Sequence, residues 1–199
     1  MRRSLGVIAI CLISSTAFAA DWYGPTAGGY GGGPKKLVCP PHAIMVGVSG
    51  RLGAYIDRLQ IVCRDLREVR DPDGYVRIQT PGPPYDAGGH MGYSTGGQPY
   101  SQRLCSNDPY PRPAGARIAA INFVDYGRSQ ALNFITMQCA ELWQGHSTHH
   151  NAGMGTADGI RPFWLQCPQG LWLRGVYGRS GQFVDQLGPV CGPLDPYRL

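Results

Sequence analysis

The chemistry open to this chain depends first on its aspartates. Asp57, Asp125 and Asp185 are spread along the sequence, and two carboxylates roughly 5 to 10 Å apart can hydrolyse a glycosidic bond. These three lie in different segments, so such a pair would exist only if the fold brought two of them together. One Gly-x-Ser-x-Gly match is present, at Gly92–Gly96, but it lies in a glycine-rich stretch and not between a strand and a helix, as a nucleophile elbow requires. We therefore predict that the chain is not an enzyme.

A group of histidines is the second candidate for chemistry. His146, His149 and His150 lie in the glycine-rich run QGHSTHHNAG, and imidazole groups are common zinc ligands. No cysteine or carboxylate completes the group at close spacing, since the next acid, Asp158, is distant. We therefore interpret the run as a solvated linker and predict no metal and no cofactor.

The elements that must position these side chains are repeated within the chain. Residues 39–63 and 167–191 align over 25 positions without a gap, and 11 of the positions are identical. Both segments keep a cysteine at each end, a central Gly-Arg and the pattern Gly-x-x-x-Asp. Residues 116–139 form a degraded third copy, in which Tyr-Gly-Arg-Ser recurs but Gly-x-x-x-Asp is lost. Three related units are therefore expected.

Each unit has the pattern of a β-hairpin. Glycines at residues 50 and 53 mark the turn of the first unit, because glycine tolerates the positive φ of tight turns. On either side, residues alternate with their neighbours as in a strand. The alternating sets are Ile44, Val46 and Val48 before the turn, and Tyr55, Asp57, Leu59 and Ile61 after it.

The cysteines predict how the units are cross-linked. Residue 51, in the first turn, is midway between Cys39 and Cys63, and residue 179 is midway between Cys167 and Cys191. Residues equidistant from a hairpin turn face each other across the two strands. We therefore predict one disulfide in each unit. The predicted pairs are Cys39–Cys63, Cys105–Cys139 and Cys167–Cys191.

The first twenty residues have the features of a secretory signal. Arg2 and Arg3 precede an apolar stretch over residues 5–13, and the small residues at 17–20 suit cleavage before Asp21. No later stretch has the ~18 to 20 apolar residues of a membrane-spanning helix. An even number of cysteines outside the signal also suits an oxidising compartment. We predict a secreted or periplasmic protein with no transmembrane segment.

Composition favours an all-β domain that does not bind nucleic acid. The chain has 29 glycines, 17 prolines and only 16% charged residues, and its short alternating runs are bounded by Gly and Pro. Removal of the signal lowers the formal charge from +5 to +3. The remaining arginines are scattered rather than gathered into a basic stripe, so no nucleic-acid surface is predicted.

The predicted domain organisation follows from the repeats. A Gly/Tyr-rich flexible N-terminus covers residues 21–36, and one three-repeat domain covers residues 37–194. The repeats span about 37–66, 103–143 and 164–194, loops cover 71–102 and 144–160, and a tail covers 195–199. Each hairpin unit has one apolar face that it cannot bury alone, so three units packed about a common axis would form a three-sided prism.

The third unit resembles the C-terminal motif of jacalin-like lectins. The resemblance is strongest over Gly175–Gly188, which reads GVYGRSGQFVDQLG, and is fair in the first unit. It implies a β-prism I fold of three pseudo-symmetric antiparallel Greek-key sheets. The disulfide in every unit departs from that family and is similar in outline to the vitelline-membrane outer-layer protein.

The resemblance also implies a sugar-binding loop between strands. Its first copy is Gly181, Gln182, Phe183, Val184 and Asp185, and its second copy is Gly53, Ala54, Tyr55, Ile56 and Asp57. An ionised aspartate accepts hydrogen bonds from two sugar hydroxyls, and glycine lets the ligand approach the backbone. Tyr55 or Phe183 would add an apolar contact.

Structural roles for the same residues stay open at this point. Each aspartate can also cap its own turn by accepting hydrogen bonds from backbone N–H groups. Arg51, Arg128 and Arg179 recur in all three units, even where the aspartate is lost, which favours a role in the fold such as binding turn carbonyls.

The sequence thus predicts a secreted, non-catalytic lectin whose partner is a glycan or polysaccharide. The alternative is a structural or interaction protein of the cell envelope that uses the prism as a scaffold. A homo-oligomer is compatible with either reading.

Overall fold

The structure is a computed structural model that describes residues 20–93, 95–105, 114–126, 129–142, 147–155 and 162–195. The predicted signal up to residue 19, Arg128, His146 and the end of the predicted tail lie outside the described residues. Within these ranges the regular structure is all β. No helix among them is long and apolar enough to cross a membrane.

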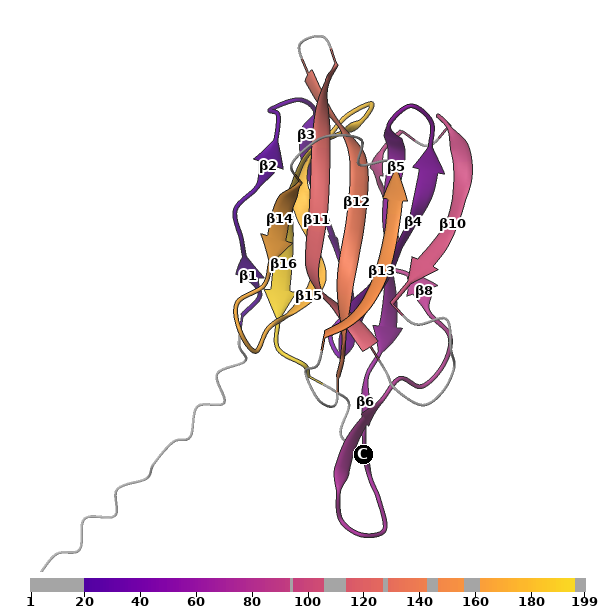
Figure 1. Cartoon of the computed structure of the whole chain (residues 1–199), viewed down its shortest axis with the longest axis vertical. Helices are drawn as coiled ribbons and strands as arrows, with labels where there is room; N and C mark the ends of the chain where they lie inside the picture. Colours follow the sequence, from indigo (N-terminus) through magenta and orange to yellow (C-terminus); the bar gives the residue numbers. More distant parts are fainter. Residues whose placement is uncertain are drawn as a thin grey trace, which may run out of the picture.

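Three antiparallel sheets form the body of the molecule (Figure 1). Each is built around one hairpin of the sequence repeat, as predicted. Sheet one contains β4 (Ala43–Leu52) and β5 (Ile56–Asp65), sheet two contains β11 (Ala114–Tyr126) and β12 (Ser129–Glu141), and sheet three contains β15 (Trp172–Ser180) and β16 (Val184–Gly192).

Outer strands complete each sheet as a Greek key, in which the fourth strand returns beside the first. Sheet one has the order β10–β4–β5–β8, with β9 also on β5, and sheet two has the order β14–β11–β12–β13. The outer strands of these sheets are β8 (Tyr85–Asp86), β9 (Met91–Gly92), β10 (Gln98–Leu104), β13 (Ser147–Gly155) and β14 (Phe163–Gln166).

Sheet three is completed by the N-terminal segment, so the prediction of a flexible stretch over residues 21–36 is wrong. Strands β1 (Trp22–Tyr23) and β2 (Ala27–Gly28) pair with β16, and β3 (Gly33–Val38) pairs with β15. The domain therefore begins near residue 22 rather than 37. These strands are short and, apart from Leu37, exposed or half-buried, so they lack the apolar alternation by which strands are recognised.

The predicted loops also contain strands. Residues 71–102 include β8, β9 and the start of β10, and residues 144–160 include β13, where His149 and His150 lie. The predicted repeat spans therefore covered only the central hairpins. The physical reason is again that edge strands, which are hydrogen-bonded on one side, need less apolar surface than central ones.

A β-bulge in β4 interrupts the strict alternation of side chains that the sequence predicted. The register of β4 and β5 shifts between Met45 and Gly47, so Val48 points into the central core, whereas Ile44 and Val46 pack in a second cluster. A single inserted residue reverses every side chain beyond it. The expectation that Ile44, Val46 and Val48 share one face is therefore corrected.

One hydrophobic core lies between the three sheets. Its fully buried members include Leu59 from sheet one, Ile135 from sheet two and Leu187 from sheet three. The closure buries the inner face of each sheet against the other two, as predicted for a prism. At ~25 cal/mol per Å² of apolar surface, this burial is the main stabilising contribution.

The three disulfides confirm the predicted pairing. The Cα–Cα distance is 5.6 Å in Cys39–Cys63, 5.7 Å in Cys167–Cys191 and 5.4 Å in Cys105–Cys139. All six cysteines are buried. The bridges join neighbouring sheets and do not cross a hairpin, because Met45, Ala116 and Leu173 lie opposite Cys63, Cys139 and Cys191 in the hairpin ladders. The first cysteine of each pair instead follows an outer strand of the next sheet, namely β3, β10 or β14.

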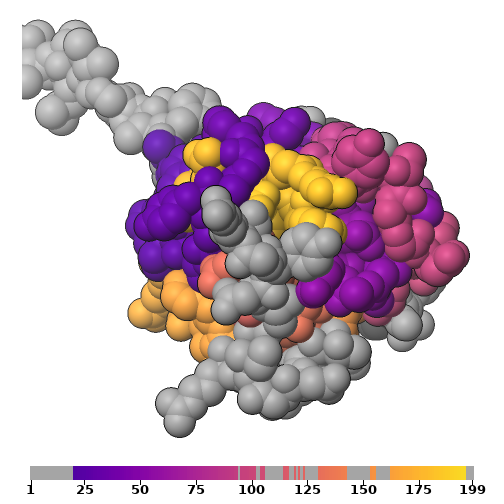
Figure 2. Space-filling model, turned by 90° about the horizontal axis from the view of Figure 1, so that it is seen from above, coloured from indigo at the N-terminus to yellow at the C-terminus, as the bar shows by residue number. Residues whose placement is uncertain are grey.

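The hairpin turns gather at one end of the molecule, which we call the apex. Figure 1 shows this end at the top, and Figure 2 looks down onto it. There the indigo N-terminal segment, the yellow C-terminal hairpin and the purple segment of sheet one lie side by side. Segments far apart in the sequence therefore share one surface.

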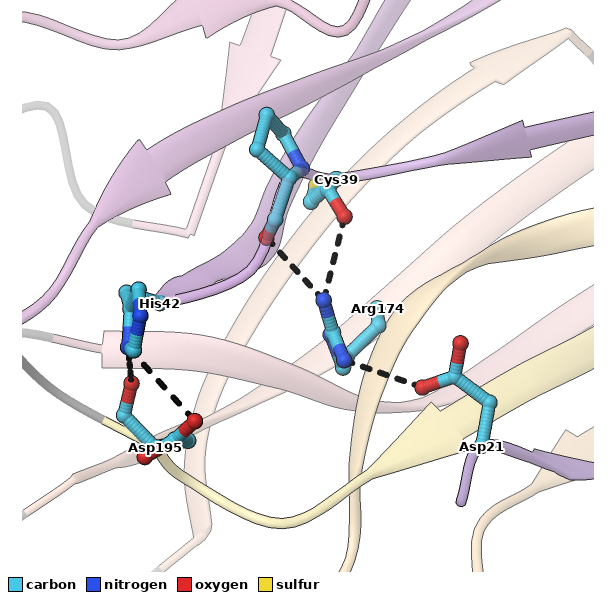
Figure 3. Close-up of polar contacts among 6 residues, drawn as sticks. Asp21, Cys39, His42, Arg174 and Asp195 are labelled. Atoms are coloured by element: carbon cyan, nitrogen blue, oxygen red, sulfur yellow. Dashed lines mark hydrogen bonds and ion pairs between the residues drawn. The ribbon is translucent and has the colours of Figure 1, made fainter. Parts of the chain in front are cut away.

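At the other end, Asp21 and Asp195 are bound to residues of the prism (Figure 3). The Arg174 guanidinium donates to the Asp21 carboxylate at 2.9 Å and to the carbonyl oxygens of Cys39 and Pro40 at 3.2 and 3.0 Å. The Nδ1 of His42 lies 2.7 Å from the carbonyl oxygen of Asp195. These contacts tie the N-terminal strands and the C-terminal segment to the same base.

A separate ribbon extends from this base. Strands β6 (Arg67–Arg70) and β7 (Val76–Gln79) pair with each other in their own two-stranded sheet. Figure 1 shows it extending beyond the prism, on the side away from the apex. Tyr75 at its tip is 67% exposed.

Candidate functional site

Three equivalent bulges mark the apex. In sheet three, Ser180 pairs with Val184 but Arg179 pairs with Gln186, which leaves Asp185 as the extra residue. In sheet one, Leu52 pairs with Ile56 and Arg51 with Arg58, which leaves Asp57 extra. Bulges re-aim a side chain and occur often beside functional sites. Both predicted aspartates therefore occupy the same special backbone position.

The third bulge holds an asparagine. In sheet two, Phe123 pairs with Leu132 and Asn122 with Phe134, so Asn133 is the extra residue. Beyond this bulge the strands of unit two pair at four further positions, up to Tyr126 and Ser129, whereas units one and three have one such pair. The Tyr-Gly-Arg-Ser of unit two, which the sequence comparison aligned with Tyr177–Ser180, is therefore not at the equivalent position. Unit two thus keeps the bulge but carries a neutral amide in place of the carboxylate.

A glycine of positive φ confirms the equivalence of the three bulges. Gly28, Gly92 and Gly155 have φ of 105°, 84° and 92°, and each lies against the carbonyl oxygen of one bulge residue. A Cβ on these glycines would lie 2.3, 2.2 and 2.0 Å from the carbonyl oxygens of Asp185, Asp57 and Asn133. Only glycine permits this close approach.

A second glycine segment packs beside each aspartate and is held by the repeated arginine. Arg179 donates from Nε to the carbonyls of Tyr30 and Gly31 at 3.1 Å and from Nη2 to the carbonyl of Gly32 at 2.6 Å. In sheet one, Arg51 donates to the carbonyls of Gly96 and Gly97. The predicted role of these arginines in binding turn carbonyls is therefore confirmed for both.

Asp185 is enclosed by the two glycine segments. Its Oδ2 accepts a hydrogen bond from the Gly181 N–H at 3.1 Å. Its Oδ1 faces Gly31, where a Cβ would lie only 2.3 Å away. The residue is 4% exposed, so the carboxylate caps its own loop as well as lying at the apex.

Asp57 has the same neighbours but is less buried. Cβ atoms on Gly53, Gly96 and Gly97 would lie 2.8, 2.9 and 2.5 Å from its carboxylate oxygens. The side chain is partly exposed, and Gly53 and Ala54 beside it are exposed. Asp57 is thus the more accessible of the two apical carboxylates.

The environment of Asp185 shifts its protonation. Burial raises the pKa of Asp185 above its ordinary value of 3.8, and the hydrogen bond from Gly181 and the charge of Arg179 partly oppose this shift. A raised pKa means that the folded protein binds this proton more readily than the unfolded chain does. The ionised carboxylate therefore costs stability at neutral pH.

We expect the destabilisation caused by ionised Asp185 to disappear as the pH falls through the raised pKa of this carboxyl group. The free energy of unfolding of Asp185→Asn should exceed that of the parent at neutral pH, and the difference should shrink on acidification. Urea unfolding of both proteins at several pH values between 7 and the acid range measures it. A difference that grows as the pH falls would show that Asp185 is stabilised in its ionised form.

Two aromatic rings connect the loops of units one and three. Tyr55 and Phe183 occupy equivalent positions, and their ring centroids are 5.7 Å apart with the planes at 75°. This edge-to-face arrangement is one that aromatic pairs prefer. The two Gly-x-x-x-Asp loops are therefore in direct contact.

The other predicted loop residues divide into two groups. Gly181, Gln182, Gly53 and Ala54 are exposed at the apex, whereas Ile56 and Val184 are fully buried in the core. Backbone turns close the two loops in the same way, with Gly53 N–H donating to the Tyr55 carbonyl at 2.9 Å and Gly181 N–H to the Phe183 carbonyl at 3.0 Å. Ile56 and Val184 thus anchor the loops.

The glycine segments before β3 and β10 were missed by the sequence analysis. A signal was present, because Gly31–Pro34 reads GGGP and Gly96–Pro99 reads GGQP. The matching stretch of unit two, residues 159–162, reads GIRP and has lost the second glycine. Unit two therefore departs from the pattern in both the bulge residue and this segment.

Asp57, Asp125 and Asp185 lie on three different sheets. The part of the chain that the structure describes contains no group of three His, Cys, Asp or Glu placed to hold a metal ion.

Comparison with known proteins gives a clear result at the level of structure alone. No family model matches the sequence, and no curated protein does. Wild-type Malaysian banana lectin superposes with a TM-score of 0.56 at 20% identity, over 87% of this chain and 99% of the lectin. A mannose binding jacalin-related lectin from Ananas comosus has a TM-score of 0.55 at 17% identity, over 88% and 98%.

A third similar structure is that of Calystegia sepium agglutinin, with a TM-score of 0.51 at 18% identity over 86% of this chain and 96% of the agglutinin. The likeness covers nearly the whole length of these proteins. Together with the three Greek-key sheets, it shows that the chain has the β-prism fold of jacalin-related lectins.

Proposed function

We propose that this chain, which has the fold of jacalin-related lectins, is an exported carbohydrate-binding protein without catalytic activity. The Gly53–Asp57 and Gly181–Asp185 loops are proposed to recognise sugar hydroxyls. The observation that carries the proposal is the pair of bulge aspartates, each enclosed by two glycine segments at one end of the prism.

The chemistry of the loops suits a sugar. A carboxylate accepts charge-assisted hydrogen bonds from neighbouring hydroxyls, which are about twice as strong as bonds between neutral groups. Glycine segments without side chains leave the nearby backbone open to a ligand. Arg51 and Arg179 hold those segments in position, so the site is organised before the sugar arrives.

Several observations support export. Three disulfides are typical of proteins that mature in an oxidising compartment. The predicted cleavage before Asp21 would leave that residue at the N-terminus, where its carboxylate binds Arg174. The strands that begin at residue 22 would then follow the cleavage site directly.

We expect the refolded protein to bind on a glycan array that includes mannose-bearing glycans, which the Ananas comosus lectin binds, and biantennary N-glycans, with which a Calsepa lectin was solved. Asp57→Asn and Asp185→Asn should each weaken binding by about 1.5 to 3 kcal/mol, or roughly 10-fold to 150-fold, because a charge-assisted acceptor is replaced by a neutral one. The substitution copies the residue that unit two carries at the same bulge.

Asp73→Asn, at an exposed position of the β6–β7 ribbon, serves as the matched control and should bind like the parent. Circular dichroism should show all four proteins folded. If the parent binds no sugar on the array, or both bulge variants bind as well as the parent, the loops are structural. The prism would then be the scaffold of an envelope protein that contacts other partners.

A further inference from the structure

We propose that the two aspartate loops form one composite site for an oligosaccharide, with the Tyr55 and Phe183 rings as a shared platform between them. This inference rests on the proposed function and specifies the ligand as a chain of several sugars. Its basis is the direct contact of the two rings at the seam between sheets one and three.

The two rings occupy the same position in their loops. Tyr55 and Phe183 each lie two residues before the bulge aspartate of their loop and in the same turn conformation. Both side chains are only partly buried. A ligand held by Asp57 on one side and by Asp185 on the other would pass over these rings, whose flat apolar faces suit the C–H face of a sugar.

Unit two differs from units one and three at its bulge, where it has neither an aspartate nor an aromatic ring two residues before that position. Its bulge residue is Asn133, and its strands stay paired for four positions beyond the bulge, up to Tyr126 and Ser129. The residues before the bulge, Ala131 and Leu132, are fully buried aliphatic side chains. The loops of units one and three each combine a bulge carboxylate with an aromatic ring two residues before it, and these two loops adjoin each other.

The residues around the Tyr55–Phe183 pair are exposed and have small or neutral side chains. Ala54 and Gln182 flank the rings and are exposed, as are Gly53 and Gly181. These four exposed residues are small or neutral, so they place no charge and no large apolar side chain beside the rings. Two weak contacts joined by one ligand behave as an intramolecular pair, and the gain in affinity from such joining is roughly 100-fold or more.

Isothermal titration calorimetry with methyl mannoside, mannobiose, mannotetraose and mannohexaose tests the inference. The parent should bind two methyl mannosides per chain weakly, and one long oligosaccharide per chain about 100-fold more tightly. Tyr55→Leu and Phe183→Leu keep apolar volume but remove the flat face. Each should lower the affinity for the long oligosaccharides about tenfold while changing the affinity for methyl mannoside little.

Tyr75→Ala, which removes an exposed ring at the opposite end, is the control and should leave all affinities unchanged. The inference is overturned if two long oligosaccharides bind per chain, if affinity grows only in proportion to the number of sugar units, or if the leucine variants weaken all ligands equally. In these cases the proposed function stands and the loops act separately. If no sugar binds on the array or in the titration, the proposed function falls and the composite site with it.

Discussion

A chain that begins at Cys39 should fail to fold, whereas the chain from Asp21 to Leu199 folds cooperatively. The missing segment supplies three strands of sheet three. Strand β3 pairs with β15 from Gly33 to Val38, and β1 and β2 pair with β16. Removing it leaves both hairpin strands of that sheet without outer partners.

The expected loss of stability is larger than a small domain can tolerate. Leu37 is 5% exposed and packs in the central core, and truncation of one such side chain typically costs 2 to 5 kcal/mol. The deletion also removes the ladder hydrogen bonds of three strands and the partner of Arg174, Asp21. Domains of this kind have about 5 to 15 kcal/mol in total.

Far-UV circular dichroism and urea unfolding after oxidative refolding measure this effect. A suitable control shortens the β6–β7 ribbon by replacing residues 70–76 with two glycines. Among the described residues, β6 and β7 pair only with each other, so this protein should keep a cooperative transition. A cooperative transition in the chain from Cys39 would mean that the N-terminal strands are dispensable, as the sequence alone suggested.

Removing one disulfide should cost about 3 to 4 kcal/mol of unfolding free energy. Cys39–Cys63 and Cys167–Cys191 both join residues 24 positions apart, and a loop of this length loses about 3.5 kcal/mol of chain entropy on cross-linking. The double variants Cys39→Ala/Cys63→Ala and Cys167→Ala/Cys191→Ala should therefore lose similar amounts.

The two double variants serve as controls for each other in urea unfolding. Either should remain folded, since the loss is smaller than the stability of a typical domain, while removal of both bridges should leave the domain at the margin of stability. Because the bridges lie away from the apex, folded variants should bind glycans like the parent. Losses under about 1 kcal/mol would indicate that the bridges add little to the prism.

Much of the fold could be predicted from local patterns. The hairpins were recognisable because Gly50 and Gly178 and the paired cysteines repeat at the same spacing. The disulfide pairs were predicted correctly, but the bridges join neighbouring sheets and not the two strands of a hairpin. Binding of backbone carbonyls by the repeated arginines was also predicted, since Arg51 and Arg179 recur at the turns of units one and three. A pattern that recurs at constant spacing reports a shared local structure.

The site itself depended on residues that are far apart in the chain. Tyr55 and Phe183 are 128 positions apart, as are Asp57 and Asp185, and no spacing rule indicates that their loops meet. Gly31 lies against Asp185 because β3 returns beside β15. Contacts of this kind arise only when the sheets close about a common axis.

The sequence by itself determined the β-hairpins and the loops that carry the two aspartates, because each depends on neighbours within about 25 residues. It also indicated which cysteines pair, through the repeat, although the bridges join neighbouring sheets. Only the tertiary structure decided that the N-terminal strands complete sheet three, that Asn133 takes the third bulge, and that two of the three loops meet at one seam. Edge strands and bulges have little local signature, since their positions are set by the partner strand and not by their own apolar pattern.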